Sequence, residues 1–118
     1  MIYTSYFAKA AKLEGVKLSI SVVTPKWVQV DGYWNAVKPA WSLVEKYKND
    51  ADEEAYTSAY EKQLAELDLS RDVRKLLSIS GDVFLLCYEA PEKFCHRHLL
   101  AKHLKEKYGL DVHEYKEA

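Results

Sequence analysis

An unbroken apolar run, Val83-Phe84-Leu85-Leu86-Cys87, decides the fold of this chain. A run without polar alternation is typical of a strand that is covered on both faces, as in a parallel sheet. It is followed by a helical segment at Glu92–Tyr108, by Gly109 as a helix stop, and by a short strand at Val112–Tyr115. This order has the length of a right-handed strand–helix–strand unit. We therefore expect parallel strands with a long helix packed against them.

The sequence before this unit adds further strands and helices. Residues 2–7 are rich in β-formers and residues 16–23 alternate apolar with polar side chains, so both predict strands, and residues 28–30 are a further short candidate. Helical spacing predicts helical segments at residues 9–13, from Trp41 onward, at residues 55–67, and from a Ser70 cap onward. Strands separated by helices predict an α/β fold, with a small, open, mostly parallel sheet of about four strands and helices on its faces.

Length and composition limit the class of protein. A chain of 118 residues predicts a single domain, 1–118, and 48% apolar with 30% charged residues is typical of a globular protein. No apolar run approaches the ~20 residues that cross a bilayer. Met1-Ile2-Tyr3 leads directly into strand-like sequence without the basic region of a signal peptide. We therefore expect a cytoplasmic protein that does not enter the membrane.

The net charge limits the possible ligands and nucleic-acid partners, and the cysteine count bears on the redox state of the thiols. With 17 basic and 18 acidic residues the net charge is −1, which argues against non-specific binding of duplex DNA but leaves room for a local phosphate pocket. The two cysteines are expected as free thiols, because a cytosolic setting keeps thiols reduced.

The best candidate site lies where the apolar strand ends and the long helix begins. Cys87-Tyr88-Glu89 leaves the strand, Pro91 is expected in the first helical turn, and Cys95-His96-Arg97 follows in the first turns. Ligands of parallel sheets bind beyond the carboxyl ends of the strands. A helix start adds unpaired N–H groups and a positive dipole end, which suit an anion. The pattern thus predicts a small anionic ligand, such as a nucleotide or another phosphate.

Arg97 is the central cation of this site. At 100° per residue it falls in the middle of the helix face that packs on the sheet, and a buried charge is costly unless it is paired. Glu89 is the nearest anionic partner in sequence, and a ligand phosphate or carboxylate is the alternative. An Arg97–Glu89 pair that only holds loop to helix is the structural interpretation.

Cys95 is the candidate nucleophile, because a thiolate at a helix start beside His96 and Arg97 would be stabilised. A helix that starts at Pro91 would turn Cys95 away from Arg97 by roughly 160°, so this role requires a helix that begins near Cys95. Glu89 and His96 are the right chemical types for proton transfer. Cys87 is either a site residue or plain core.

The same cysteines raise the question of a metal. Cys87, Cys95, His96 and His98 could supply four ligands, but their spacing is not a standard zinc pattern. We therefore assign no metal and no cofactor.

A loop rich in aromatic residues, residues 27–41, is the second feature. Its Trp27, Tyr33, Trp34 and Trp41 could form a stacking wall for a base or sugar ring, or a cap of indoles that closes the core. The remaining candidates for ligand binding at this edge are Ser5, Tyr6 and Lys38.

Two segments carry a resemblance to a known family. Leu85–Pro91, running into Phe94–Leu100, resembles the bacterial family catalogued as domain of unknown function 488, and residues 2–8, 24–27 and 38–43 look like its short variant. The similarity covers nearly the whole chain. It implies a compact α/β fold and marks five motif positions, Cys87, Glu89, Cys95, His96 and Arg97. It implies no substrate.

Two hypotheses for function follow. In the first, an enzyme or a former enzyme binds a small anionic ligand: Arg97 and the helix start hold the anion, Glu89 or His96 moves protons, and the tryptophan loop closes over the ring. In the second, the protein is a non-catalytic module that binds single-stranded nucleic acid or a protein partner through residues 27–41. The sequence does not assign a reaction, and it does not give the oligomeric state.

Overall fold

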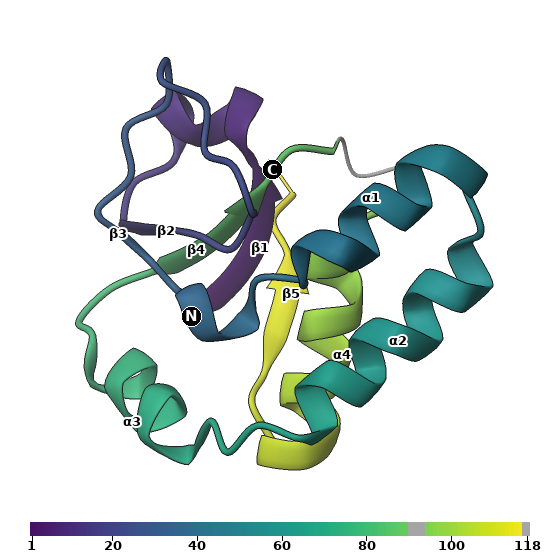
Figure 1. The fold of residues 1–118 in the computed structure, drawn as a ribbon. Coiled ribbons are helices and arrows are strands. Elements are labelled where there is room, and N and C mark those ends of the chain that lie inside the picture. The colour runs from purple at the N-terminus through teal and green to yellow at the C-terminus, as the bar shows by residue number, and fades with distance from the viewer. Residues whose placement is uncertain (90–93, 117–118) are drawn as a thin grey trace.

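Five parallel strands form one open sheet in the computed structural model, which describes residues 1–89 and 94–116 (Figure 1). The strands are β1 Ile2–Tyr6, β2 Val16–Ser19, β3 Gly32–Tyr33, β4 Val83–Cys87 and β5 Val112–Glu114. Their order across the sheet is β3-β2-β4-β1-β5. The predicted α/β class is confirmed, and the sheet is parallel throughout.

β4 lies at the centre of this sheet. It pairs with β1 on one side and with β2 on the other, and all of its residues are buried. This two-sided cover explains why Val83–Cys87 carries no polar alternation. Tyr6 of β1 pairs with Cys87, and Ser19 of β2 pairs with Leu86, so three strands end at one edge.

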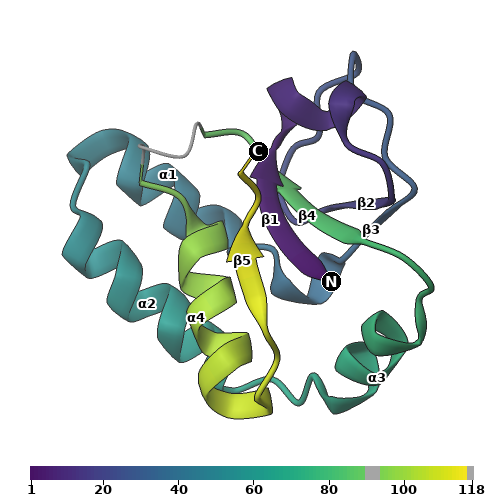
Figure 2. The same cartoon turned by 180° about the vertical axis from the view of Figure 1, so that it is seen from behind.

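The two faces of the sheet are covered differently. Helices α1 Trp41–Asp50, α2 Glu53–Ala65 and α4 His96–Tyr108 lie on one face (Figures 1 and 2), and α3 Ser70–Ser78 joins the same core through Val73 and Leu76. The 3₁₀ helix η1 Phe7–Lys12 covers the other face, where Phe7 and Leu13 meet Phe84 and Leu86. A second 3₁₀ helix, η2 Asn35–Val37, precedes α1.

Three segments before β4 differ from the sequence-based expectation. The strand predicted to Val23 ends at Ser19, where the Ser19 hydroxyl lies 2.6 Å from the Thr24 hydroxyl and the chain bends. The short strand expected at residues 28–30 is absent, and Gly32–Tyr33 pairs with β2 instead. The helical segment expected at residues 9–13 is part of a 3₁₀ helix that begins at Phe7 and ends at Lys12.

The expected Ser70 cap is wrong by one position. Leu69 is the N-cap of α3, and the Asp68 carboxylate accepts a hydrogen bond from the Ser70 backbone N–H at 3.0 Å. Leu69 itself is buried, and its N–H donates to the Tyr108 hydroxyl. The side chain that bonds the start of α3 is therefore that of Asp68, two residues before the expected Ser70 cap.

The long helix begins later than expected. α4 starts at His96, and Cys95 is its N-cap with extended backbone angles. The expectation for Pro91 in the first turn lies outside the described residues. Gly109 ends the helix with a φ of 64°, as predicted, because glycine adopts this left-handed conformation without steric cost. A late start is the condition that the nucleophile hypothesis for Cys95 required.

None of the helices within residues 1–89 and 94–116 is long and apolar enough to cross a membrane.

Candidate functional site

A pocket of about 690 Å³ opens at the carboxyl edge of the sheet. Its floor is formed by Cys87 at the end of β4 and by Cys95 and His96 at the start of α4, and α1 forms the opposite wall. The chain leaves β1 toward β2 and leaves β4 toward β5, in opposite directions across the sheet. Neighbouring strands with diverging connections mark the place where α/β sheets bind ligands. Among the residues that line it are Cys87, Tyr88, Glu89, Cys95 and His96.

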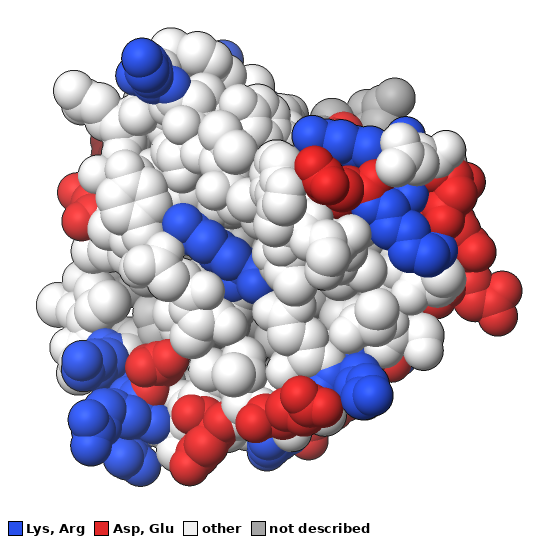
Figure 3. Space-filling view, viewed as in Figure 1, with Lys and Arg blue, Asp and Glu red and all other residues white. Residues whose placement is uncertain are grey.

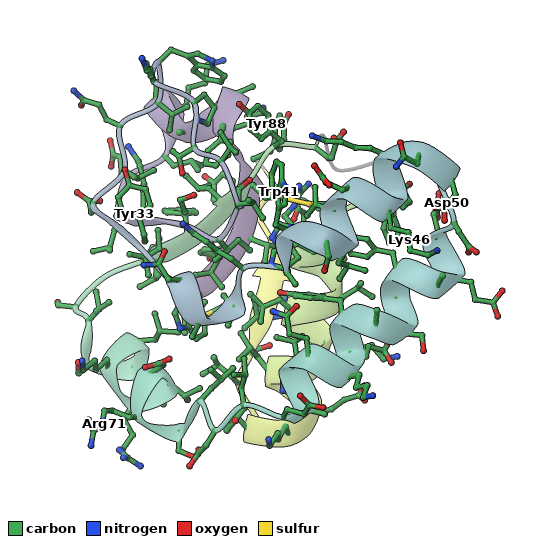
Figure 4. The ribbon with its side chains drawn as sticks, viewed as in Figure 1. Tyr33, Trp41, Lys46, Asp50, Arg71 and Tyr88 are labelled. Carbon is green, nitrogen blue, oxygen red and sulfur yellow. A yellow bond between two sulfur atoms is a disulfide. The ribbon has the colours of Figure 1, made fainter. Side chains whose placement is uncertain are left out.

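Aromatic rings form much of the pocket wall. Phe94 lies with its ring centre 5.3 Å from both Tyr47 and Tyr56, and these two tyrosines are 5.4 Å apart. Trp41 stands at the mouth, where it is 49% exposed, with the Lys48 ammonium 5.4 Å from its ring. Figure 4 shows Trp41 at the start of α1, and the Tyr88 ring packs edge-on against Phe7 of η1 with ring centres 5.3 Å apart. This wall offers flat apolar surface and one cation.

Cys87 and Cys95 are not free thiols, so that expectation is wrong. Their sulfur atoms lie at disulfide distance, and both residues line the pocket. The expectation rested on cellular compartment alone. The compartment says nothing about the distance between the two residues. In the structure, β4 ends at Cys87, and Cys95, the N-cap of α4, lies next to it.

Arg97 is fully buried, as the helical phase predicted, but its carboxylate partner is Glu114 instead of Glu89. Its Nε and Nη2 atoms donate to the two Glu114 oxygens, both at 3.0 Å. Its Nη1 atom donates to the Cys87 sulfur at 3.0 Å and to the backbone carbonyl of Glu89. The Tyr6 ring lies 5.7 Å from the guanidinium carbon. Arg97 therefore joins β4, α4 and β5 beneath the pocket.

Glu114 is the site residue that the sequence analysis missed. It lies on β5, and its Oε1 atom also accepts a hydrogen bond from the Thr4 hydroxyl at 2.6 Å. The signal was present, because a period of two places Glu114 on the same strand face as the buried Val112. A carboxylate on the core face of an edge strand was the partner that a buried arginine required.

His96 is held as a neutral imidazole against Cys95. Its Nε2 atom lies 2.8 Å from the Ile20 carbonyl oxygen, which can only accept, so Nε2 carries the ring proton. Nδ1 is then unprotonated and faces the Cys95 sulfur at 3.9 Å. Burial lowers the pKa of His96 to about 4. The ring is therefore a proton acceptor aimed at a cysteine.

The other predicted ligand-binding residues are not gathered in one place. Glu89 and Tyr88 line the pocket, whereas Ser5 is buried in β1 with its side chain on the opposite face from Tyr6 and the pocket. Tyr6 contacts Arg97 instead of the pocket.

The aromatic side chains of residues 27–41 also lie in different places. Trp27 is 67% exposed away from the pocket lining, and the Lys38 ammonium lies 5.1 Å from the Tyr33 ring. Trp34 is buried and donates its indole N–H to Asp72 at 2.9 Å. In Figure 4, Tyr33 lies far from Trp41. One stacking wall made of the whole loop is therefore not formed, and Trp41 alone of the three tryptophans lines the pocket.

The ligand atoms of Cys87, Cys95 and His96 lie within 4.8 Å of one another. A sulfur that is bonded in a disulfide offers no thiolate to a metal, so this geometry assigns no metal site.

Charges on the visible face are mixed. Figure 3 shows basic and acidic side chains interspersed over α1 and α2, a group of basic side chains with acidic neighbours over α3, and mostly uncharged surface with separate basic side chains over the rest of that face. This face carries no continuous basic stripe of the kind that holds duplex nucleic acid.

Comparison with known proteins agrees with the motif around these residues. No curated protein and no solved structure matches the chain. A family model, DUF488-N3a, described as the active DUF488-N3 subclade, matches residues 2–108, which include both cysteines, His96 and Arg97. The chain belongs to the DUF488 family.

Proposed function

We propose that the pocket binds a small anionic ligand that carries a planar ring, with a nucleotide as the representative type. The observation that carries this proposal is a pocket of about 690 Å³ at the strand ends, walled by aromatic rings and floored by the start of a 13-residue helix. Small-molecule sites in α/β proteins typically combine an apolar wall with a few convergent polar groups.

Each part of the ligand has a matching surface. The ring stacks on Trp41 and against Tyr47 and Phe94, whose faces and edges line the pocket. The anionic group faces the backbone N–H groups at the start of α4, where the helix dipole is positive. Lys48 supplies a further cation at the mouth.

Glu89 and Arg97 take different roles from those expected. The Glu89 carboxylate lines the pocket and suits hydrogen-bond donors of the ligand, such as ring N–H groups or hydroxyls. Arg97 lies beneath the lining and is bonded to Glu114 and Cys87, so in this proposal it holds the floor without touching the ligand.

Calorimetric titration with adenine and guanine nucleotides tests the proposal. We expect Trp41→Ala and Lys48→Gln to weaken binding by about tenfold each, since a base–aromatic stack contributes ~1–3 kcal/mol. The matched controls are Trp27→Ala, an exposed tryptophan outside the pocket, and Lys46→Gln, which removes a lysine that pairs with Asp50 on the same helix. Absence of binding by every nucleotide at millimolar concentration, or equal loss in the controls, would overturn the proposal.

A further inference from the structure

We propose that Cys87 and Cys95 form a thiol–disulfide exchange centre that opens onto the pocket, with Cys95 as the attacked sulfur and Cys87 as the leaving sulfur. The co-reactant is a small-molecule thiol. This activity uses the same pocket as the proposed nucleotide site but needs no nucleotide, so the two proposals stand or fall separately.

The surroundings of Cys87 suit a leaving thiolate. Cys87 is 1% exposed, and its sulfur accepts an N–H bond from the buried Arg97 guanidinium at 3.0 Å. Glu114 balances the arginine charge, so a thiolate here would be held by a charge-assisted hydrogen bond that is already oriented. A thiol that is stabilised as thiolate leaves faster in disulfide exchange.

The surroundings of Cys95 suit attack and re-attack. It is the N-cap of α4, where the helix dipole favours a thiolate, and it is the more exposed of the two cysteines, at 6% against 1%. The unprotonated Nδ1 of His96 faces its sulfur, and the Ile20 carbonyl fixes that tautomer. Cys95 therefore has a built-in proton acceptor, whereas Cys87 has a built-in donor.

The exchange balances in two steps. The thiolate of the small molecule attacks the Cys95 sulfur, a new S–S bond forms, and the Cys87–Cys95 bond breaks with its electron pair on Cys87. A second thiolate attacks the small-molecule sulfur of this mixed disulfide and releases Cys95. The protein gains two electrons and two protons, and two thiols become one disulfide. In reverse, the Cys95 sulfur attacks a small-molecule disulfide, and its proton passes through His96 to the departing thiolate. The Cys87 sulfur then attacks the Cys95 sulfur of the mixed disulfide, and its proton goes to the second departing thiolate.

Alkylation and mass measurement in glutathione buffers test the equilibrium. Reduced and oxidised glutathione are mixed in a series of ratios, the protein is alkylated under denaturing conditions, and the number of labelled cysteines is read from the mass. We expect two labels at reducing ratios, none at oxidising ratios, and a reversible transition between them. Protein in which both cysteines are labelled at every ratio, or in which two thiols hold a stoichiometric metal ion, would overturn the inference.

Single variants test the assigned roles. Cys87→Ser is expected to form a mixed disulfide with glutathione at Cys95, at least about tenfold faster than Cys95→Ser forms one at Cys87. His96→Gln keeps a donor for the Ile20 carbonyl but removes the acceptor that faces Cys95. We expect it to slow alkylation of Cys95 at neutral pH on the order of tenfold, because an ordinary thiol with a pKa of about 8.5 is only about 3% thiolate at pH 7, and to move the rise in rate toward that pKa.

Lys105→Gln is the control on the same helix, since Lys105 is exposed, and it should react as the native protein does. Circular dichroism verifies that each variant is folded. Equal rates at the two cysteines, or an unchanged pH profile in His96→Gln, would contradict the assignment of attacking and leaving sulfur.

Discussion

The buried Arg97 and the partly buried Glu114, whose side chain is 16% exposed, form an ion pair beneath the pocket. Two parallel hydrogen bonds join the groups, and the Nη1 atom of the guanidinium donates to the Cys87 sulfur and to the Glu89 carbonyl. Removal of one member of such a pair leaves a desolvated charge without compensation. The pair therefore couples the stability of the fold to the position of the cysteine.

At this scale, Glu114→Gln should lower the free energy of unfolding by about 3 kcal/mol, because Arg97 keeps its charge and loses its counterion. Urea denaturation measures the change. Glu106→Gln is the control, since Glu106 meets Lys102 only on the exposed side of α4, at 3.9 Å, and its loss should change stability little. Equal effects of the two substitutions would show that the buried pair is not structural.

His96 gives a second prediction for a single residue. Its pKa is about 4 when folded and near 6.5 when unfolded, so between these values the unfolded chain binds more protons and stability falls as the pH is lowered. The loss is complete near pH 4 and on the order of 3 kcal/mol. Urea midpoints of the native protein and of His96→Gln, compared from neutral pH downward, measure it. The difference between them should shrink with falling pH, and a constant difference would contradict the burial of a neutral His96.

Residues were predicted unevenly from sequence. The inward direction of Arg97 followed from helical phase, because a 100° step is a property of the backbone. Its partner Glu114 did not follow, because Glu89 is nearer in sequence and only the folded sheet brings the core face of β5 to the start of α4. The meeting of Cys87 with Cys95 depends on the path of the chain between them, which no local pattern specifies.

At the scale of elements, the start of α4 at His96 determines which side chains lie at the candidate site. Phe94 packs on Tyr47 and Tyr56, and Cys95 stays extended as the N-cap, so the first helical turn presents His96 and Arg97 to the sheet. Helix propensity alone favours an earlier start. Tertiary packing of Phe94 on α1 and α2 is the physical reason for the difference, and such packing cannot be read from a single segment.

Two glycines test how closely elements approach. Gly15 and Gly81 both have positive φ, 153° and 89°, so alanine at either site costs about 1–2 kcal/mol. A Cβ on Gly15 would also collide with the backbone carbonyl of Asp82, which accepts the Val16 N–H where β2 meets β4, whereas a Cβ on Gly81 meets nothing. We expect Gly15→Ala to destabilise by at least about 1 kcal/mol more than Gly81→Ala in urea denaturation. Equal losses would contradict the close approach.

For the whole molecule, the sheet separates a large core from a small one. Leu100 belongs to the core beneath α1, α2 and α4, and Leu86 belongs to the core beneath η1. Both cores pack on one continuous sheet, because β4 contributes Val83 and Leu85 to one core and Phe84 and Leu86 to the other. We propose that the chain unfolds as a single cooperative domain.

Substitutions that create a cavity in one core or the other test whether the chain unfolds as a single domain. Leu100→Ala and Leu86→Ala should each cost about 2–5 kcal/mol, while Leu77→Ala, at an exposed position, should cost little. Circular dichroism and tryptophan fluorescence should report one coincident transition in every variant. Two separate transitions, or a loss confined to one probe, would contradict a single domain.

The overall class was predictable, whereas the strand order was not. The apolar run of β4 predicted a strand that is covered on both faces, and the period of two predicted β2. β3 has only two residues and no pattern of its own, because its pairing depends on Asp31, Gly32 and Trp34 bonding to β2 from a loop. Strand pairs of this kind depend on contacts between segments that are distant in the sequence.

Nitrogen–proton correlation NMR of the protein titrated with a nucleotide tests the central claim, a ligand pocket at the strand ends, most directly. The account predicts shifts that saturate at the Trp41 indole and at the amides of Cys87, Cys95 and His96, and none at the Trp27 indole. Shifts confined to Trp27 and Tyr33 would indicate the non-catalytic aromatic-loop module instead. Those shifts, or no shifts at all, would contradict the pocket.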